Sequence, residues 1–436
     1  MKTLGLLCLA AVAPALAAPA DDLRSQADRE LPSLLAAYKD LHAHPELSQH
    51  EERTSAFLTA ELRRAGYTVT DHIGKYPDGT AAFGIAAVLK NGAGPVVLVR
   101  TEMDALPVEE KTGLAFASQN AGVMHACGHD LHMASFLGTA RLLAKLKDRW
   151  SGTLLLIGQP AEETAGGARA MLADDLYSRL ATPDFAIALH DEPSIEAGKV
   201  GVVSGPLAAS STSVDVVIRG VGGHGARPEL TKDPIVAAAQ FILAIQTIVS
   251  RQVPPQEPAV VTVGSIHGGS KHNIIPDQVA LQLTTRSYSD EVRRTILAAI
   301  EREARGMALA AGVPDNLAPI VKVSATDTTP VTYNDPKLAA RLRSAFVAAL
   351  GEGNVVDHKP LMTSEDFGRF GLEGRQIPAF MFLLGASEPA KLAESLRTGK
   401  PLPSLHSSQF YPEVEPALRT GIVSTTAAVL ELARKD

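Results

Sequence analysis

The chain is poor in cysteine, aromatic residues and positive charge. Its 436 residues include two cysteines, one tryptophan and 5% aromatic residues. Cys8 lies in an apolar N-terminal segment, so a processed chain keeps only Cys127 and cannot form an intramolecular disulfide. The formal net charge of -7 and the lack of a basic stripe argue against a nucleic-acid partner. The internal apolar runs are short, and we expect none of them to span a membrane.

The N-terminus has the composition of a signal peptide. Lys2 supplies a positive region, Leu4 to Val12 is apolar, and small-x-small patterns follow. We expect cleavage near Ala17 or Ala20, and therefore a periplasmic or secreted mature protein. A single free thiol is a liability in an oxidising compartment, and metal coordination would remove it. This favours a metal-binding role for the remaining cysteine.

The stretch Met-His-Ala-Cys-Gly-His-Asp-Leu-His-Met at 124–133 concentrates possible metal ligands. Cys127 and His129 alternate, so both side chains can face one side of a short turn, and Gly128 lets the backbone bend between them. Thiolate and imidazole groups are good ligands for a borderline-soft divalent metal. The alternative interpretation is a buried cysteine beside structural histidines.

Apolar strands alternate with helical patterns in the first half of the chain, which predicts an α/β sheet. The strands are expected at 81–89, 95–101, 153–158 and 185–189. Polar groups follow three of them in succession: Asp104, then Glu162 and Glu163, then His190. Ligands bind at the carboxyl ends of strands in open α/β sheets, so these four side chains are candidate site residues.

The pattern changes near residue 206 to strand, helix, strand, strand, helix, strand. This order is typical of a split, ferredoxin-like arrangement. We therefore expect an α/β catalytic domain with a mixed, helix-covered sheet and an inserted α+β ferredoxin-like domain. The predicted divisions are the signal peptide at 1–20, the catalytic domain at 21–205 and 328–436, and the insertion at 206–327.

Five side chains are suited to bind metal at the predicted sheet edge: Cys127, His129, Glu163, His190 and His406. Five ligands exceed the needs of one tetrahedral zinc ion, so we expect two divalent metal ions. Two such ions can share a water, lower its pKa and polarise a carbonyl. A carboxylate that does not bind metal must then take the proton of the water and pass it to the leaving amine, and one of the two adjacent glutamates suits that task. His42 and His44 precede strands rather than follow them, which favours structural roles.

Motifs in the expected order across nearly the whole mature chain resemble one family. It is the di-metal amidohydrolase family of aminoacylases, hippurate hydrolases and plant auxin-conjugate hydrolases, related to glutamate carboxypeptidase. The motifs are Leu-His-Ala-His-Pro-Glu-Leu-Ser (41–48), Met-Asp-Ala-Leu-Pro (103–107), Met-His-Ala-Cys-Gly-His-Asp (124–130), Gln-Pro-Ala-Glu-Glu (159–163), the strand-ending His190, Gly-Gly-His-Gly-Ala-Arg-Pro (222–228), Asn-Ile-Ile-Pro-Asp (273–277), Ser-Glu-Asp-Phe (364–367) and Leu-His-Ser (405–407).

The resemblance implies a role for each candidate. The five ligands above match the family's ligands, with Cys127 in the bridging position. Glu162 matches the general acid/base, and Asp104 the carboxylate that supports the metals from behind. His224 matches a histidine that helps hold the oxyanion, often across a dimer interface. Asn273 and Arg286 match substrate-contacting positions, and a guanidinium can bind a carboxylate in bidentate fashion.

The sequence leaves several alternatives open. His224 could be an ordinary loop histidine, and Arg286 a solvated strand charge. Glu102 stands where the family pattern has aspartate, which leaves the metal preference open. By ligand softness we expect zinc, with manganese, cobalt or nickel as alternatives.

The resemblance implies a metal-dependent amidohydrolase acting on N-acyl amino acids or short peptides. The inserted domain would serve as a lid and as the contact surface of a homodimer. A carboxypeptidase or dipeptidase on the same scaffold is the alternative enzyme. A non-catalytic periplasmic binding protein is the alternative from another class.

Overall fold

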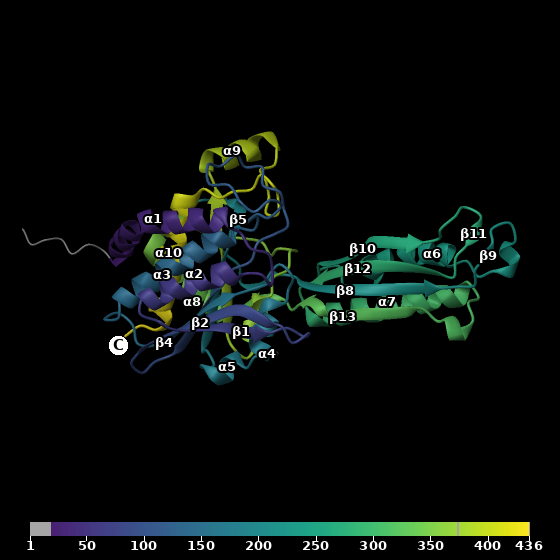
Figure 1. Cartoon of the computed structure of the whole chain (residues 1–436), viewed down its shortest axis with the longest axis horizontal. Coiled ribbons are helices and arrows are strands. Elements are labelled where there is room, and N and C mark those ends of the chain that lie inside the picture. The colour runs from purple at the N-terminus through teal and green to yellow at the C-terminus, as the bar shows by residue number, and fades with distance from the viewer. Residues whose placement is uncertain (1–18, 373–374, 436) are drawn as a thin grey trace, which may run out of the picture.

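The computed structural model describes residues 19–372 and 375–435, which form two lobes (Figure 1). The larger lobe is built around an eight-stranded sheet, and the second, elongated lobe around a four-stranded sheet. Most of the predicted signal peptide, including Cys8, lies outside the described residues.

The eight-stranded sheet has the order β1-β2-β4-β3-β5-β16-β6-β15. Its strands are β1 (Thr68–Lys75), β2 (Ala81–Asn91), β3 (Val96–Glu102), β4 (Gly152–Gln159), β5 (Phe185–Glu196), β6 (Val200–Val202), β15 (Val355–Asp357) and β16 (Ala379–Ser387). The central strands β4, β3, β5 and β16 are parallel, and β1 and β2 add antiparallel neighbours at one side. The expected α/β class with a mixed sheet is therefore confirmed.

Helices cover both faces of this sheet because its central strands are apolar on both sides. One face packs against α1 (Pro19–Ala43), α2 (Glu52–Arg64), α3 (His129–Lys145), α8 (Pro336–Leu350) and α10 (Val414–Leu432). The other face packs against α4 (Gly167–Ala173), α5 (Leu176–Arg179) and η5 (Phe367–Gly371). In β3, Val97 and Val99 point to the first face and Leu98 to the second, as a period of two requires.

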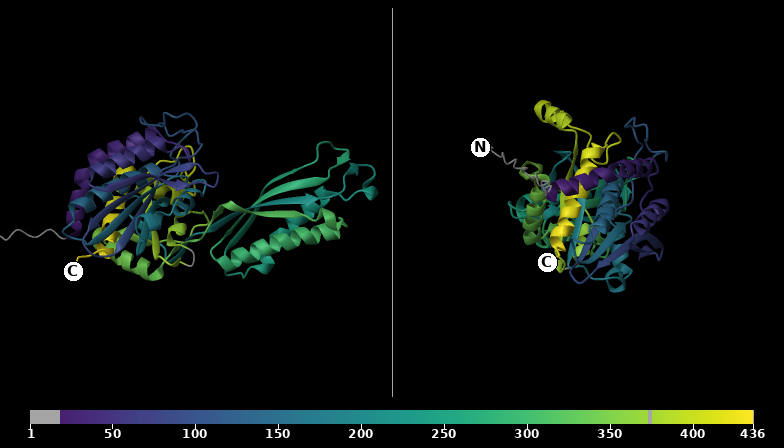
Figure 2. Two further views of the ribbon diagram at one scale, coloured as in Figure 1. Left: turned by 60° about the horizontal axis from the view of Figure 1, so that its bottom comes forward. Right: turned by 90° about the vertical axis from the view of Figure 1, so that its left-hand side faces the viewer.

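The second lobe has the element order β-α-β-β-α-β. Its elements are β8 (Ser210–Arg219), α6 (Pro234–Thr247), β10 (Ala259–Gly268), β12 (Gln278–Ser287), α7 (Asp290–Ala310) and β13 (Ile320–Thr329). The strands pair antiparallel in the order β10-β12-β8-β13. Figure 2 shows the helices on one face of this sheet and the other face open. This arrangement leaves β10 and β13 as edge strands.

Short elements complete the two lobes. They are β7 (Gly205–Ala208), β9 (Gly223–His224), η1 (Pro228–Leu230), η2 (Ile248–Gln252), β11 (Ile274–Ile275), η3 (Asp315–Leu317), β14 (Thr332–Asn334), η4 (Glu352–Asn354) and α9 (Pro389–Thr398). The strand β1 was not predicted from the sequence. It is an edge strand with bulges and mostly exposed or half-buried side chains, so it lacks the apolar run of a central strand.

The expectation that no internal segment is long and apolar enough to span a membrane was wrong for one helix. Residues 234–252, formed by α6 and the π-helical turn η2, pass that test by length and composition. Ala237, Phe241 and Ile245 nevertheless pack into the core of the second lobe. The outer face of α6 is apolar as well, and Leu243 is 72% exposed.

Candidate metal centre

The Cys127–His129 segment forms the turn that begins α3. Gly128 adopts φ 70°, and a Cβ at this position would lie 2.5 Å from Asp191 Oδ2, so the turn requires glycine. His129 Nδ1 donates to the backbone carbonyl of Asp104 over 2.8 Å. This bond leaves the Nε2 lone pair of His129 free for another partner.

Glu162 and Glu163 lie in the turn that follows β4. Their backbone N–H groups donate to the two carboxylate oxygens of Asp104, over 3.1 and 3.0 Å. Ser48 Oγ adds a third hydrogen bond to Asp104 at 2.6 Å. Burial alone would raise the pKa of Asp104, but the nearby His129 ring and the hydrogen bonds from Ser48 and the Glu163 amide hold it below its ordinary value. The Asp104 carboxylate thus holds the backbone of the turn that carries Glu162 and Glu163.

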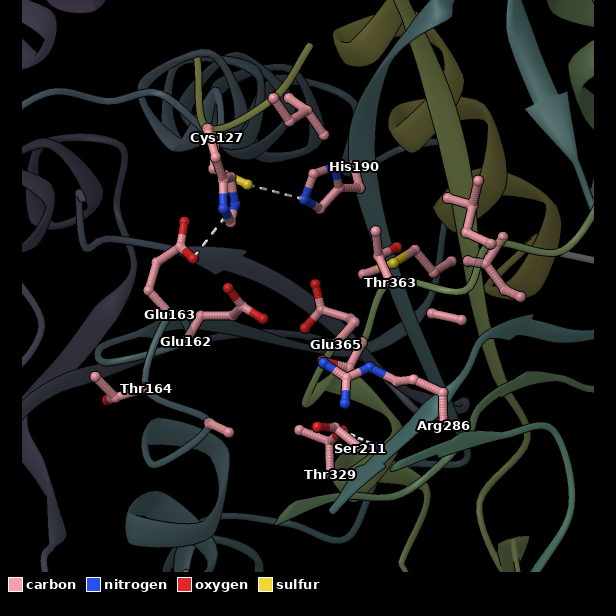
Figure 3. A pocket seen from close by; sticks show the side chains of 18 of the residues that line it. Cys127, Glu162, Glu163, Thr164, His190, Ser211, Arg286, Thr329, Thr363 and Glu365 are labelled. Atoms are coloured by element: carbon pink, nitrogen blue, oxygen red, sulfur yellow. Dashed lines mark hydrogen bonds and ion pairs between the residues drawn. The ribbon is translucent and has the colours of Figure 1, made fainter. Parts of the chain in front are cut away.

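The five predicted ligands lie close together, in two groups that share Cys127. One group is Cys127, His129 and His190, and the other is Cys127, Glu163 and His406. Within each group the candidate ligand atoms lie within 4.8 Å of one another. Cys127 Sγ is 3.6 Å from His190 Nε2 (Figure 3). His406 Nε2 is 3.5 Å from Glu163 Oε2. This geometry suits two metal ions with a bridging thiolate.

Two buried atoms in these groups support the same interpretation. Within the described residues, His129 Nε2 and Glu163 Oε1 have no hydrogen-bond partner, although they lie 4.0 Å apart. Burial raises the pKa of Glu163 to about 7, and burial with the nearby Glu163 and Glu162 raises the pKa of the Cys127 thiol. A bound cation would reverse both effects and give the unpaired atoms a partner. The donor set fits a dinuclear divalent-metal centre.

His190 does not end its strand, contrary to the prediction, because β5 continues to Glu196. The pairing of β5 with β3 stops at Ala188, so His190 still lies beyond the last paired residue of its neighbour. Its Nδ1 donates to the Asp191 carbonyl over 2.8 Å and leaves Nε2 directed at Cys127. His190 therefore lines the cavity although it lies within β5.

Glu162 lines the cavity beside the candidate ligands (Figure 3). Its Oε2 lies 3.9 Å from His129 Nε2. Burial raises the pKa of Glu162 well above its ordinary value, and Glu365 and Glu163 add to the effect. A carboxyl group with a raised pKa next to a metal centre is able to accept and return a proton.

A buried ion network beneath the centre was not predicted. Arg100 on β3 donates to Glu365 and Asp366 over 2.8 and 3.1 Å, and also contacts Glu102. The Glu102 carboxylate reaches His132 Nδ1 at 3.1 Å. Glu102 is absent from the residues that line the described cavity, but its carboxylate lies within 4.8 Å of ligand atoms of His129 and His132. The sequence signal was an arginine inside an apolar strand, which requires buried acidic partners.

His42 lies away from the ligand groups, in a structural position. Its Nδ1 is 2.7 Å from Asp130 Oδ2, and its Nε2 is 3.2 Å from Glu110 Oε1. Glu110 in turn accepts the backbone N–H of Ser118 over 2.6 Å. His42 therefore ties the loop after β3 to α1 and α3.

The cavity at the centre measures about 510 Å³ and extends to the second lobe. Ser211 on β8, Arg286 on β12 and Thr329 on β13 line it opposite Cys127 and His190 (Figure 3). Arg286 donates to the backbone carbonyl of Thr285 over 3.0 Å. Arg286 is half-buried and belongs to the cavity wall.

His224 and Asn273 do not reach this cavity in the same chain. His224 lies on β9 and Asn273 next to β11, at the far end of the second lobe (Figure 1). Both are exposed, and the Gly225 amide donates to the Asn273 carbonyl over 2.9 Å. The resemblance implied that both residues act at the substrate, His224 often across a dimer interface. Within one chain they lie far from Arg286, because β8 and β12 run the length of the lobe.

Comparison with known proteins identifies the family. Residues 98–397 match the model described as peptidase family M20/M25/M40. The chain belongs to this family. It is 38% identical over 341 residues to an N-acetyl-L-cysteine deacetylase of Bacillus subtilis, covering 77% of each chain. It is 37% identical over 332 residues to a hippurate hydrolase of Campylobacter jejuni, covering 76% of this chain and 82% of that one.

The fold also matches a solved member. The crystal structure of a dinuclear metal-binding M20-family peptidase from Bacillus subtilis superposes with a TM-score of 0.75 and 29% identity, over 94% of this chain and all of that one. The resemblance inferred from the motifs is confirmed, and membership of the family makes this M20 protein a hydrolase that acts on amide bonds.

Proposed function

We propose that this M20 protein is a metal-dependent amidohydrolase that cleaves the amide bond of N-acyl amino acids. The observation that carries the proposal is the pair of ligand groups sharing Cys127, with Glu162 beside them and outside both groups. The relatives named as a deacetylase and a hippurate hydrolase support this substrate class.

Cys127, His129, Glu163, His190 and His406 would hold two divalent ions, zinc by ligand softness, with manganese, cobalt or nickel as alternatives. When bound, such ions lower the pKa of a water and polarise the substrate carbonyl. Asp104 keeps the Glu163 turn and the His129 ring in place for this task.

Glu162 is the general base in this proposal. Its carboxylate would take the proton of the attacking water and deliver it to the leaving nitrogen, which departs as a free amine. Arg286 would bind the substrate carboxylate, because its guanidinium lines the same cavity from the second lobe. The products are a carboxylic acid and an amino acid.

The second lobe, residues 206–327, would be a ferredoxin-like lid and dimerisation domain. Val236 and Leu243 on α6 are 54% and 72% exposed, and Ile266 on the edge strand β10 is 50% exposed. An apolar helix face beside an open strand edge suits a second copy of the same surface. In such a homodimer, His224 and Asn273 of one subunit would complete the site of the other.

Residues 1–20 would act as a signal peptide and direct the protein to the periplasm or the outside of the cell. Expression with the full N-terminus, followed by sequencing of the mature protein, tests this assignment. A mature chain that still begins at Met1 would contradict it.

A substrate panel tests the activity. The purified, metal-analysed protein is assayed on N-acetyl and N-benzoyl amino acids and on dipeptides. The proposal expects higher kcat/KM for the N-acyl amino acids. Preference for dipeptides would instead favour a dipeptidase or carboxypeptidase on this scaffold, and ligand binding without product would favour a binding protein.

A further inference from the structure

One wall of the cavity is apolar and belongs to the core of the larger lobe. This acyl wall consists of Leu207, Leu361, Met381 and Leu383, all of which line the cavity. Leu383 on β16 is paired in register with His190 on β5, so its side chain lies on the same face of the sheet. Met381, two residues earlier, shares that face, and both side chains are at most 2% exposed.

The acyl wall is held in a fixed position. Leu207, Met381 and Leu383 pack in the same hydrophobic cluster, with Leu361 packed against it. The Leu361 N–H donates to the Leu207 carbonyl over 2.7 Å, which joins the two segments of the wall. Leu207, Met381 and Leu383 are at most 2% exposed, so the half-buried Leu361 supplies most of the apolar surface that a substrate can reach. This surface is present before a substrate arrives, and binding to it orders few side chains.

The order of the strands determines which part of the substrate faces this wall. Across the sheet the strands run β4, β3, β5, β16. Glu162 follows β4, His190 lies on β5, and Met381 and Leu383 lie on β16, beyond His190. The leaving nitrogen must face the acid that protonates it. Glu162 lies at one side of the centre, so the leaving nitrogen faces that side. The acyl chain, which is the other substituent of the carbonyl carbon, then points toward the acyl wall.

The third side of the cavity is polar and suits the amino-acid end. Ser211, Arg286 and Thr329 supply hydroxyl groups and one guanidinium from the second lobe (Figure 3). A carboxylate binds there more favourably than against leucine and methionine, because burying an unpaired charge is costly. The acyl wall is thus left for the acyl chain.

We infer that Leu207, Leu361, Met381 and Leu383 form an acyl-binding subsite that selects apolar acyl groups of about six carbons or more over acetyl. This inference rests on the proposed amidohydrolase function. An acetyl group has only a methyl to place on the wall. Each further methylene buried there improves transition-state binding by about fourfold.

Two substrate series test the subsite. In the first, glycine carries acetyl, butyryl, hexanoyl or benzoyl groups, and kcat/KM is expected to rise at least tenfold from acetyl to hexanoyl. In the second, acetyl is kept and glycine is replaced by alanine or leucine, with a smaller rise expected. A larger rise in the second series would assign the wall to the amino-acid side chain and overturn the inference.

Leu361 is the residue to change because it is half-buried and its substitution disturbs the core least. Leu361→Phe fills the wall and Leu361→Ser makes it polar, so both should lower the hexanoyl-to-acetyl ratio of kcat/KM at least tenfold. Leu396→Ser, on the exposed face of α9, is the matched control and should leave the ratio unchanged.

The outcomes separate the two proposals. Two results would overturn the subsite alone. In the first, kcat/KM does not depend on acyl length. In the second, the Leu361 variants are folded by circular dichroism but keep the wild-type hexanoyl-to-acetyl ratio of kcat/KM. If no N-acyl amino acid is hydrolysed by the metal-loaded protein, the proposed function fails and the subsite with it.

Discussion

Asp104 accepts the backbone N–H of Glu163 over 3.0 Å, so a buried carboxylate holds the turn that carries a candidate metal ligand. The same carboxylate accepts the Glu162 N–H over 3.1 Å. One side chain thus sets the positions of the proposed ligand and the proposed base together. Because both bonds involve the backbone, they orient the turn whichever glutamate side chain binds metal.

Asp104→Asn should weaken metal binding without removing a ligand. Asparagine has one acceptor oxygen, so one of the two glutamate amides loses its partner. We expect metal affinity to fall about 10–100-fold and the free energy of unfolding to fall by about 1–3 kcal/mol. Metal titration and urea unfolding measure these effects. Ser48→Ala, which removes a single hydrogen bond to Asp104, is the milder control; equal losses in the two variants would contradict the argument.

Glu162→Gln should abolish hydrolysis and leave the metal content intact. The amide cannot accept the water's proton, and the change preserves side-chain size. We expect kcat to fall by about 10²–10⁴ with little change in KM. Steady-state kinetics with metal analysis of the same sample gives both values. Wild-type turnover by this variant would exclude Glu162 as the base.

Chelation should show that activity and stability depend on metal, and Cys127→Ser should show that the two ligand groups share one thiol. A chelator should inactivate the protein and lower its melting temperature, because bound metal stabilises the folded state. Cys127→Ser should lose more than one metal per chain, whereas His406→Ala, which alters one group, should keep the other site largely filled. Inductively coupled plasma analysis counts the ions. Similar losses in both variants would argue against a shared ligand.

His42 should make the stability of the protein depend on pH in the alkaline range. Burial alone would lower the pKa of His42, but Asp130 and Glu110 raise it from 6.5 to about 9. Since the folded-state pKa lies above the ordinary value, the stabilisation is fully present below pH 6.5 and is lost as the pH rises through about 9.

Urea unfolding of the wild type and of His42→Gln from pH 6 to pH 10 measures this dependence. The difference between the two free energies of unfolding should shrink by on the order of 2–3 kcal/mol across the range. His50→Gln, at an exposed position, is the control. A difference that stays constant with pH would show that His42 is not protonated in the folded protein.

The proposed dimer predicts that activity depends on the outer face of α6. Leu243→Glu places a charge on this face and should yield monomers with reduced activity, while Leu396→Glu on the larger lobe should not. Analytical ultracentrifugation measures the association state. A fully active monomer of Leu243→Glu would remove the dimer from the proposal.

Mixed subunits test whether His224 acts in the partner's site. Glu162→Gln and His224→Ala chains are each expected to be inactive as homodimers. Co-expression should restore activity, because one site of the mixed dimer then receives both an intact Glu162 and an intact His224. If isolated mixed dimers stay inactive, His224 does not act in the partner's site. It would then act in the site of its own subunit or have no role in catalysis.

Much of the fold and most of the ligand set followed from local pattern. Apolar runs of four or more residues marked the central strands, and the polar residues just beyond them marked the sheet edge. The two- to four-residue strands such as β6, β7 and β15 were missed because so few residues carry no measurable period. The edge strand β1 was missed because its side chains are mostly not buried.

The network around Arg100 shows where sequence reasoning stopped. An arginine in an apolar strand indicates that acidic partners are buried beside it. The sequence does not identify these partners, because Glu365 and Asp366 follow the second lobe in the chain and reach Arg100 only in the folded protein. The same holds for the acyl wall, whose members come from β7, from β16 and from the loop after β15. The residues in these contacts are far apart in the sequence and form no local motif that would predict them.

The sequence by itself determined the residue types of the centre, since thiolate, imidazole and carboxylate groups in the 124–133 motif and beyond the strands suit two metals and a proton carrier. The tertiary structure decided how they are shared. Packing placed Cys127 in both ligand groups, drew Arg286 into the cavity and left His224 and Asn273 at the far end of the second lobe. The physical reason is that ligand distances depend on strand order and lobe length, which arise from hydrogen bonds and burial between segments far apart in the chain.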